Sequence, residues 1–240
     1  MLVIPHFYNW HKDLNPATKA EIEQLSKTKK VSKGQYIYTL GEKSDACYQL
    51  VSGRVNICVF SKEGDYVVIS TMHVGDCFGD VGLINERPRS NYAVASEDCV
   101  VSVLSQKNYQ YLILKFPDML ISINKSLADR CHLAVETLED VYLLPLYQRV
   151  AKTLIRLALN DGTTKEDNSI EVVNISQEKI GLMVGATRQS ISRELKRMEK
   201  DNMLSLKYNK LTIPNLPEMI ERLEESCSLE FMISDFRDKK

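Results

Sequence analysis

The sequence predicts an α+β protein with a β-rich first half, one long central helix and a helical second half. Seven of the ten glycines lie before residue 83, among short runs rich in Val, Ile, Tyr and Phe, a pattern typical of strands joined by tight turns. Residues 118–144 then contain no glycine or proline and carry apolar residues at helical spacing. Beyond Pro145, shorter segments show the same helical spacing, so we expect several further helices.

Composition limits the kind of partner. The 240 residues are 44% hydrophobic and 26% charged, which suits one large or two modest globular domains. The 31 Lys and Arg against 32 Asp and Glu give a net charge of −1, so a nucleic-acid partner requires a locally basic face. No apolar run approaches the roughly 18 residues of a membrane span, so we expect a cytoplasmic protein with no membrane partner. The six cysteines form no C-x-x-C pair, and no metal site is expected.

The first 116 residues are expected to form a β jelly roll preceded by a short helix. Asn15 and Pro16 provide an N-cap and a first helical residue, and this helix is expected to run towards Leu25. So many short strands at close intervals favour a barrel or a double-sheet roll. The predicted strands, separated by turns that contain Gly, Asp or Asn, are Gln35–Thr39, Ala46–Val51, Arg54–Phe60, Tyr66–His73, Asp76–Phe78, Ser90–Ala95 and Cys99–Ser105.

Residues 117–145 are predicted to form a dimerisation helix and a hinge. About 27 residues span roughly 40 Å at 1.5 Å per residue, more than one small roll would cover. Pro145 interrupts the helix, because proline lacks an amide proton and clashes with the preceding turn. The alternative is an ordinary amphipathic helix that lies on its own sheet. We expect a parallel homodimer through a seam whose positions step by four and three: Leu120, Asn124, Leu127, Cys131, Ala134, Leu138 and Val141.

Residues 146–216 are expected to form a winged helix-turn-helix. Ser176 is a good N-cap for one helix, Gly185 provides a left-handed stop, and Thr187 caps the next helix. A two-stranded wing is expected at Leu204–Ile213. The remaining residues, 217–240, are expected to hold a short helix and a tail.

A locally basic face coincides with this motif. From Arg188 to Lys210 there are seven basic and three acidic residues, so the segment carries +4 in a chain of −1. Guanidinium, amide and hydroxyl groups at the start of a helix can read base edges in the major groove or hold phosphates. A solvated charged face, or a helix-turn-helix in a protein that binds no DNA, is the alternative interpretation. Besides Lys207 and Lys210 of the wing, the residues predicted to contact DNA are Ser176, Gln177, Thr187, Arg188, Gln189, Ser192, Arg193 and Lys196.

A second motif lies in the predicted roll, where the glycine-rich segment Gly75–Ile84 is followed by Pro88-Arg89-Ser90. Glycines let backbone amides approach an anion closely, Arg89 can bind a phosphate through two N–H groups, and Ser90 adds a hydroxyl donor. Asp80 could accept a sugar hydroxyl. The alternative interpretation is an ordinary hairpin with an exposed arginine.

These two motifs, in this order, with Tyr48-Gln49-Leu50-Val51-Ser52-Gly53 ahead of both and a long helix between them, resemble the CRP/FNR family of bacterial transcription regulators. The resemblance covers residues 33 to about 214. It implies a jelly-roll sensor domain, a parallel dimer through the long helix, and winged helix-turn-helix domains that clamp a palindromic double-stranded DNA site. RNA polymerase is an expected partner of such a regulator, although no motif for it can be read.

The resemblance also implies an effector site. The family's phosphate-binding residues correspond to Gly79, Arg89 and Ser90, and its sugar-binding glutamate corresponds to Asp80. The Thr-Ser pair that holds adenine corresponds to Ala134 and Val135, whose side chains form no hydrogen bonds. A cyclic nucleotide is therefore one candidate effector, and a different small effector or an active state without ligand are the others. The predicted effector site comprises Gly79, Asp80, Val81, Arg89, Ser90, Ala134 and Val135. In the recognition helix Gln189 stands where several members carry Glu, so their base preference is not transferred.

Three other kinds of protein can be built on the same fold: an iron-sulfur sensor, a metal-dependent enzyme and a haem or redox sensor. The N-terminal cysteine cluster of the FNR branch is absent, which argues against an iron-sulfur oxygen sensor. A metal-dependent cupin enzyme needs two or three converging histidines, whereas the roll offers His73, so we expect no enzyme. A haem or redox sensor stays open as an alternative, with possible axial ligands at His6, His11, His73, Cys47, Cys77 and Met72.

Overall fold

The computed structural model describes residues 8–60, 66–173, 175–207, 209–225, 227 and 229. The chain divides into two compact units between His132 and Leu133, which we call the N-terminal and C-terminal units. Within the described residues no helix is both long and apolar enough to cross a membrane.

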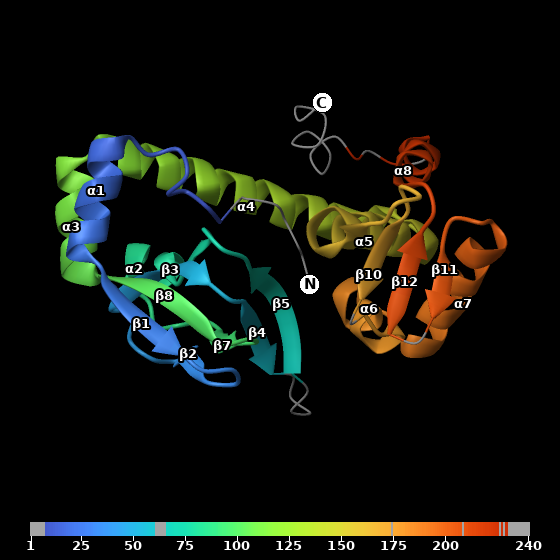
Figure 1. Ribbon diagram of the computed structural model, residues 1–240, viewed down its shortest axis with the longest axis horizontal. Coiled ribbons are helices and arrows are strands. Elements are labelled where there is room, and N and C mark those ends of the chain that lie inside the picture. The colour runs from blue at the N-terminus through green and yellow to red at the C-terminus, as the bar shows by residue number, and fades with distance from the viewer. Residues whose placement is uncertain are drawn as a thin grey trace. The chain divides into compact units, whose positions relative to one another are not determined.

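The N-terminal unit is built on two antiparallel sheets of four strands each (Figure 1). One sheet has the order β1-β8-β3-β6 and the other the order β2-β7-β4-β5, so neighbouring strands are often distant in sequence. This arrangement confirms the predicted jelly roll. Its strands are β1 (Lys27–Val31), β2 (Tyr36–Tyr38), β3 (Ala46–Ser52), β4 (Val55–Phe60), β5 (Tyr66–Met72), β6 (Cys77–Phe78), β7 (Tyr92–Ala95) and β8 (Cys99–Ser105).

Alternation along the strands explains why the two sheets pack together. Leu50, Val55 and Met72 are almost fully buried in one cluster with Phe78 and Val101, and their neighbours along the strands are more exposed. A side chain on every second residue therefore faces the core, which is what the period of two predicts. Strand β1 was not predicted, because its sequence, KTKKV, buries only its last residue.

The described residues of the N-terminal part of the chain also form the helices α1 (Pro16–Leu25), α2 (Asp80–Ile84), α3 (Gln106–Lys115) and α4 (Pro117–Leu143). Asn15 caps α1 as predicted, and its Oδ1 accepts a hydrogen bond of 2.9 Å from the Thr18 N–H. Asn15 Nδ2 in turn donates to Asp118 at 2.8 Å, which ties α1 to the first turn of α4. The long helix ends at Leu143, one residue before the predicted end, since Pro145 cannot continue the ladder.

The C-terminal unit combines helices with a small antiparallel sheet of order β11-β12-β10-β9, whose strands β10, β12 and β11 stand side by side in Figure 1. Its core includes Val150, Leu154, Ile191, Leu195 and Leu211, all almost fully buried. Strands β9 and β10 were not predicted. The elements are α5 (Leu146–Asp161), β9 (Thr163–Thr164), β10 (Ile170–Val173), α6 (Gln177–Val184), α7 (Arg188–Lys200), β11 (Ser205–Lys207), β12 (Lys210–Ile213) and α8 (Leu216–Glu224).

Candidate DNA-binding and effector sites

The helix-turn-helix has the local geometry that its capping residues predict. Ser176 Oγ accepts the Lys179 N–H at 3.1 Å, and Thr187 Oγ1 accepts the Ser190 N–H at 3.2 Å, so both helices begin at the expected N-caps. Gly185 ends α6 in the left-handed region with φ of 67°. A residue with a Cβ would be strained there, which is why glycine suits this turn.

Helix α7 buries one face and exposes the other. Ile191, Leu195 and Met198 are completely buried in the core of the C-terminal unit, at positions four and three residues apart. The polar face of the helix is therefore turned to solvent. Of the residues predicted to read DNA from this helix, Ser192 is half-buried, and those exposed are Arg188, Gln189, Arg193 and Lys196.

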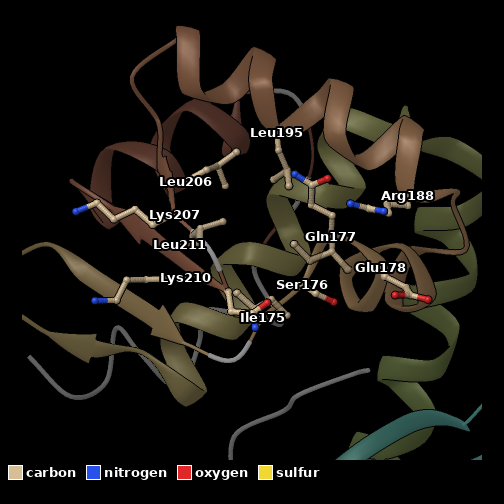
Figure 2. Close-up of a pocket in the computed structure, with 12 residues that line it drawn as sticks. Ile175, Ser176, Gln177, Glu178, Arg188, Leu195, Leu206, Lys207, Lys210 and Leu211 are labelled. Atoms are coloured by element: carbon tan, nitrogen blue, oxygen red, sulfur yellow. The ribbon is translucent and has the colours of Figure 1, made fainter.

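The wing and the helix-turn-helix enclose a groove of about 420 Å³. Figure 2 shows Lys207 and Lys210 on the wing side of this groove and Arg188, Ser176 and Gln177 on the helix side. The groove is thus bordered by cations on both sides, together with the hydroxyl and amide groups predicted to contact DNA. Its other lining residues are Ile175, Glu178, Ile180, Leu195, Leu206, Asn209 and Leu211.

The cations around the groove differ in how far their charge is balanced. Lys210 Nζ lies 2.5 Å from a carboxylate oxygen of Glu171, and Lys165 Nζ lies 2.9 Å from the other. The hydrogen bonds from Lys210 and Lys165 lower the pKa of Glu171. By contrast, Arg188, Arg193 and Lys207 form no ion pair with any residue that the structure describes. Arg188, Arg193 and Lys207 are therefore available for a polyanion.

Helix α5 contacts both helices of the helix-turn-helix. Arg149 Nη1 donates a hydrogen bond of 3.2 Å to the carbonyl of Val184 at the end of α6. The guanidinium of Arg197, in α7, lies 4.7 Å from the centre of the Tyr147 ring. Because both contacts come from the first turns of α5, the motif is fixed to the helix that follows Pro145.

In the N-terminal unit, the predicted phosphate motif places Gly79 and Arg89 in direct contact. Arg89 is only 4% exposed, so the alternative of an exposed arginine on a hairpin is wrong. Its Nη1 donates to the Gly79 carbonyl and its Nη2 to the Ala46 carbonyl, both at 2.6 Å, and its Cζ lies 4.4 Å from the centre of the Tyr38 ring. A Cβ at residue 79 would lie 2.9 Å from Arg89 Nη1, which explains the glycine.

Asp80 is held by an arginine that sequence reasoning missed. Arg130, on α4, donates to the two carboxylate oxygens of Asp80 at 3.2 and 2.8 Å, and Asp80 is 1% exposed. Burial alone would lower the pKa of Arg130, but attraction by Asp80 and the hydrogen bonds to it outweigh burial, so the pKa is raised. Fifty residues separate the pair. The chain around Arg130 reads Ala128-Asp129-Arg130-Cys131-His132, which gives no local signal that would single out this arginine.

The other predicted effector residues lie in different surroundings. Val81 and Ser90 are exposed, and Ser90 Oγ accepts a 3.3 Å hydrogen bond from Asn91 Nδ2. Ala134 and Val135 are exposed on α4 beyond the boundary between the units. Their role at the base end of the site stays a prediction.

The predicted dimer seam is largely uncovered within one chain. Met119 and Ile123 of α4 are buried in the N-terminal unit, as the amphipathic alternative requires, and Leu127 is half-buried against the same cluster. The helix therefore packs on its own unit and still presents an apolar stripe. The exposed seam positions are Leu120 (43%), Leu138 (58%) and Val141 (51%), with Asn124, Cys131 and Ala134.

Three of the six possible haem ligands are buried in the core of the N-terminal unit. Cys47, Cys77 and Met72 are each at most 2% exposed, and burial raises the pKa of Cys47 to about 12, which disfavours the thiolate that binds a metal. His6 lies outside the described residues. Within the described part of the chain, no cluster of three or more His, Cys, Asp or Glu side chains could hold a metal ion.

Comparison with known proteins identifies both domains. Residues 28–116 match the family model described as a cyclic nucleotide-binding domain, and residues 148–222 match the Crp-like helix-turn-helix domain. The cAMP-activated global transcriptional regulator CRP of Salmonella typhimurium is 30% identical over 166 residues, which cover 69% of this chain and 79% of that protein. The cAMP-activated regulator Vfr of Pseudomonas aeruginosa is 25% identical over 186 residues, covering 76% and 86% of the two chains.

Solved structures show the same fold. The c-di-GMP responsive global regulator CLP of Xanthomonas campestris superimposes with a TM-score of 0.71 at 18% identity, covering 84% of this chain and 100% of that one. A CRP/FNR family transcriptional regulator from Thermus thermophilus gives a TM-score of 0.69 at 19% identity, with the same coverage.

A jelly roll with an arginine-lined site, followed by a helix-turn-helix with an exposed basic face, defines an effector-controlled, DNA-binding transcription regulator. The chain belongs to the CRP/FNR family. The relatives named above are transcription regulators, and the comparisons do not favour the haem or redox alternative.

Proposed function

We propose that this regulator binds palindromic double-stranded DNA as a homodimer, with α7 in the major groove and RNA polymerase as a further partner. The observation that carries the DNA contacts is the exposed N-terminal part of α7, where Arg188 and Arg193 have no ion-pair partner among the described residues. Arginine in this position can bind guanine through two hydrogen bonds or hold a phosphate. Ser176, Gln177, Thr187, Gln189, Ser192 and Lys196 complete the proposed DNA contacts.

Replacing Arg188 or Arg193 with Ala tests this assignment. Loss of a base contact should weaken specific binding by about 1 to 3 kcal/mol, roughly 5- to 150-fold, and relax selectivity at one base position. The measurement is fluorescence anisotropy at fixed salt, with a duplex selected by the wild-type protein from a random pool and a scrambled duplex beside it.

Arg222→Ala is the matched control, because Arg222 is an exposed arginine of the same unit that lies on α8 and pairs with Glu218. It should leave specific binding almost unchanged. Equal losses on both duplexes for Arg188→Ala or Arg193→Ala would assign that residue to phosphate alone. Unchanged binding for both variants would refute the proposed recognition helix.

We further propose that the effector is an anion, most simply a cyclic nucleotide, bound by Gly79, Asp80, Val81, Arg89 and Ser90 with Ala134 and Val135 at its base end. Arg89 and Arg130 each carry a positive charge and Asp80 carries one negative charge, so these three side chains sum to +1. The single negative charge of a cyclic phosphodiester balances that sum. The relatives CRP and Vfr are named as cAMP-activated, and CLP as c-di-GMP responsive, which supports the same ligand class.

Arg89→Leu should reduce the affinity for cyclic AMP or cyclic GMP at least tenfold, because it removes the cation that contacts the phosphate. Isothermal titration calorimetry measures the affinity, and thermal unfolding reports whether the roll remains folded. Arg87→Leu is the matched control, since Arg87 is exposed two residues away. A coupling of about 1 to 3 kcal/mol should also make the ligand tighten DNA binding by the same factor as DNA tightens the ligand. Equal ligand affinity in both variants would refute this effector site.

A further inference from the structure

Tyr8, ahead of the first helix, lies against the effector site. The Cζ of Arg130 is 5.1 Å from the centre of its ring. The ring also packs against the cluster between the two sheets that contains Met72 and Phe78. The Tyr8 phenol forms a hydrogen bond with the side chain of Ser70, a buried residue of β5, and burial raises the pKa of that phenol. The N-terminal segment therefore places an aromatic ring inside the roll, next to the arginine that holds Asp80.

The backbone around Tyr8 is held at several points. The Tyr8 carbonyl accepts a 2.8 Å hydrogen bond from the N–H of Cys77, two residues before Gly79. Trp10 is 4% exposed, and its carbonyl accepts a 2.6 Å hydrogen bond from Ser122 Oγ on α4. Because these contacts join residues 8–10 to both the roll and α4, the backbone that carries the Tyr8 ring is held in place.

The contacts of Tyr8 have the chemistry that a nucleobase would need. An aromatic ring over the face of a guanidinium is attracted to it, and a polar atom at the ring edge can bond a serine hydroxyl. Asp80, the residue matched to the sugar end of the ligand, accepts hydrogen bonds from two N–H groups of Arg130, while the Cζ of Arg130 lies over the Tyr8 ring. Arg130 also lies four residues before Ala134 on the same helix, the position matched to the base end.

We propose that Tyr8 is an internal plug at the base end of the effector site, so that the ring of Tyr8 and the base of a cyclic nucleotide compete for Arg130 and Ser70. This proposal rests on the effector site proposed above. In the unliganded protein the plug closes the base end, and a nucleotide must displace it. The measured dissociation constant is then the intrinsic one divided by the fraction of molecules whose plug is open.

The test is to remove the plug from the full-length protein and titrate it with cyclic AMP and cyclic GMP by calorimetry. Tyr8→Ala should tighten the binding of at least one of these nucleotides about tenfold, because the open fraction approaches one. A second variant that begins at Trp10 should show the same gain. Tyr36→Ala is the matched control, because Tyr36 is a 47% exposed tyrosine of the same unit on β2, and it should leave the affinity unchanged.

Trp10 is the one tryptophan of the chain, so its fluorescence reports whether each variant keeps the roll and α4 together. Equal affinities for the wild type and both folded variants would overturn the plug and leave the effector site intact. If no cyclic nucleotide binds to the wild type or to either variant, both the plug and the proposed effector class fail. The two failures are thus distinguishable.

Discussion

Arg89 carries a buried positive charge that no carboxylate among the described residues balances. Two backbone carbonyls and the Tyr38 ring stabilise its guanidinium, yet its Nε has no hydrogen-bond partner within the described residues. A buried charge is costly unless it is paired. An anion that reaches this arginine therefore gains a charge-assisted contact for which the protein has already arranged the donor.

In the C-terminal unit, the carboxylate of Glu171 neutralises positive charge near the proposed DNA-binding surface. Its carboxylate pairs with Lys210 and Lys165. Glu171→Gln should free both lysines, strengthen binding to random duplex DNA, and steepen the slope of log affinity against log salt by about one unit. Anisotropy titrations at several salt concentrations measure that slope.

Glu218→Gln is the control for this prediction, because it frees Arg222 from an ion pair that is about half exposed and lies on α8. It changes the net charge of the chain by the same amount at a different place. A slope that rises equally in both variants would show that only total charge matters. An unchanged slope for Glu171→Gln would place Lys210 and Lys165 outside the DNA contact.

At the scale of elements, the sequence was most informative where one residue type has one structural use. Asn15, Ser176 and Thr187 begin helices as predicted, and Gly185 ends one, because caps and left-handed turns restrict the choice of residue. Strand β10 was missed because only four residues, IEVV, form it, and it pairs with β12 some forty positions later. Short strands specified by distant partners leave little local pattern.

Within the sites, too, residues that belong to a local motif were predicted, and residues brought together only by the fold were not. The motif around Gly79 and Arg89 is contiguous enough to recognise. Arg130 and Tyr8 meet Asp80 and Ser70 only because the roll folds them together, over separations of fifty residues or more. Their roles depend on burial and orientation, which the sequence does not encode locally.

The junction between α4 and α5 contains four charged side chains that sequence reasoning did not connect. Lys152 Nζ lies 2.5 Å from a Glu136 oxygen and 2.8 Å from an Asp140 oxygen, and Arg156 lies within 3.7 Å of both acids. Each pair is spaced by four residues on its own helix, so each pair shares a helix face. All four side chains are at most 14% exposed. This quartet bridges Pro145, which was predicted to be a hinge, and restrains α5 against the last turns of α4.

Lys152→Met should lower the free energy of unfolding of the C-terminal unit by about 3 to 5 kcal/mol, because it leaves two buried carboxylates with a single cation. The combination Lys152→Met with Glu136→Leu restores charge balance, so it should cost clearly less than the sum of the single changes. Urea denaturation followed by circular dichroism measures the free energy of unfolding of the two single variants and the double variant.

Strictly additive losses would show that the four charges do not act together. Glu218→Gln is the control, because it breaks an exposed ion pair, and it should cost less than about 1 kcal/mol.

At the scale of the whole molecule, α4 has two apolar faces. One face, with Met119 and Ile123, is buried in the N-terminal unit. The other leaves Leu120, Leu138 and Val141 between 43% and 58% exposed, a stripe that the described part of the chain leaves uncovered. A second copy related by a two-fold axis would cover it with the same residues and would place two α7 helices for two half-sites. Half-site centres about one helical turn apart, roughly 34 Å, are then expected.

Leu138→Asp together with Val141→Asp should convert the dimer to monomers and reduce binding to the palindrome to about the level of one half-site. Both side chains are more than half exposed in a single chain, so the substitutions introduce charge without removing core packing; Leu127 is less suitable because it is half-buried in its own unit. Leu114→Asp is the matched control, since Leu114 on α3 is 84% exposed and lies outside the seam. Sedimentation equilibrium gives the mass and anisotropy gives the DNA affinity. A double variant that stays dimeric would exclude this seam. A wild-type monomer with full affinity for the palindrome would exclude the dimer. Two-fold symmetric DNA increases the affinity of a protein only when both half-sites are bound at once.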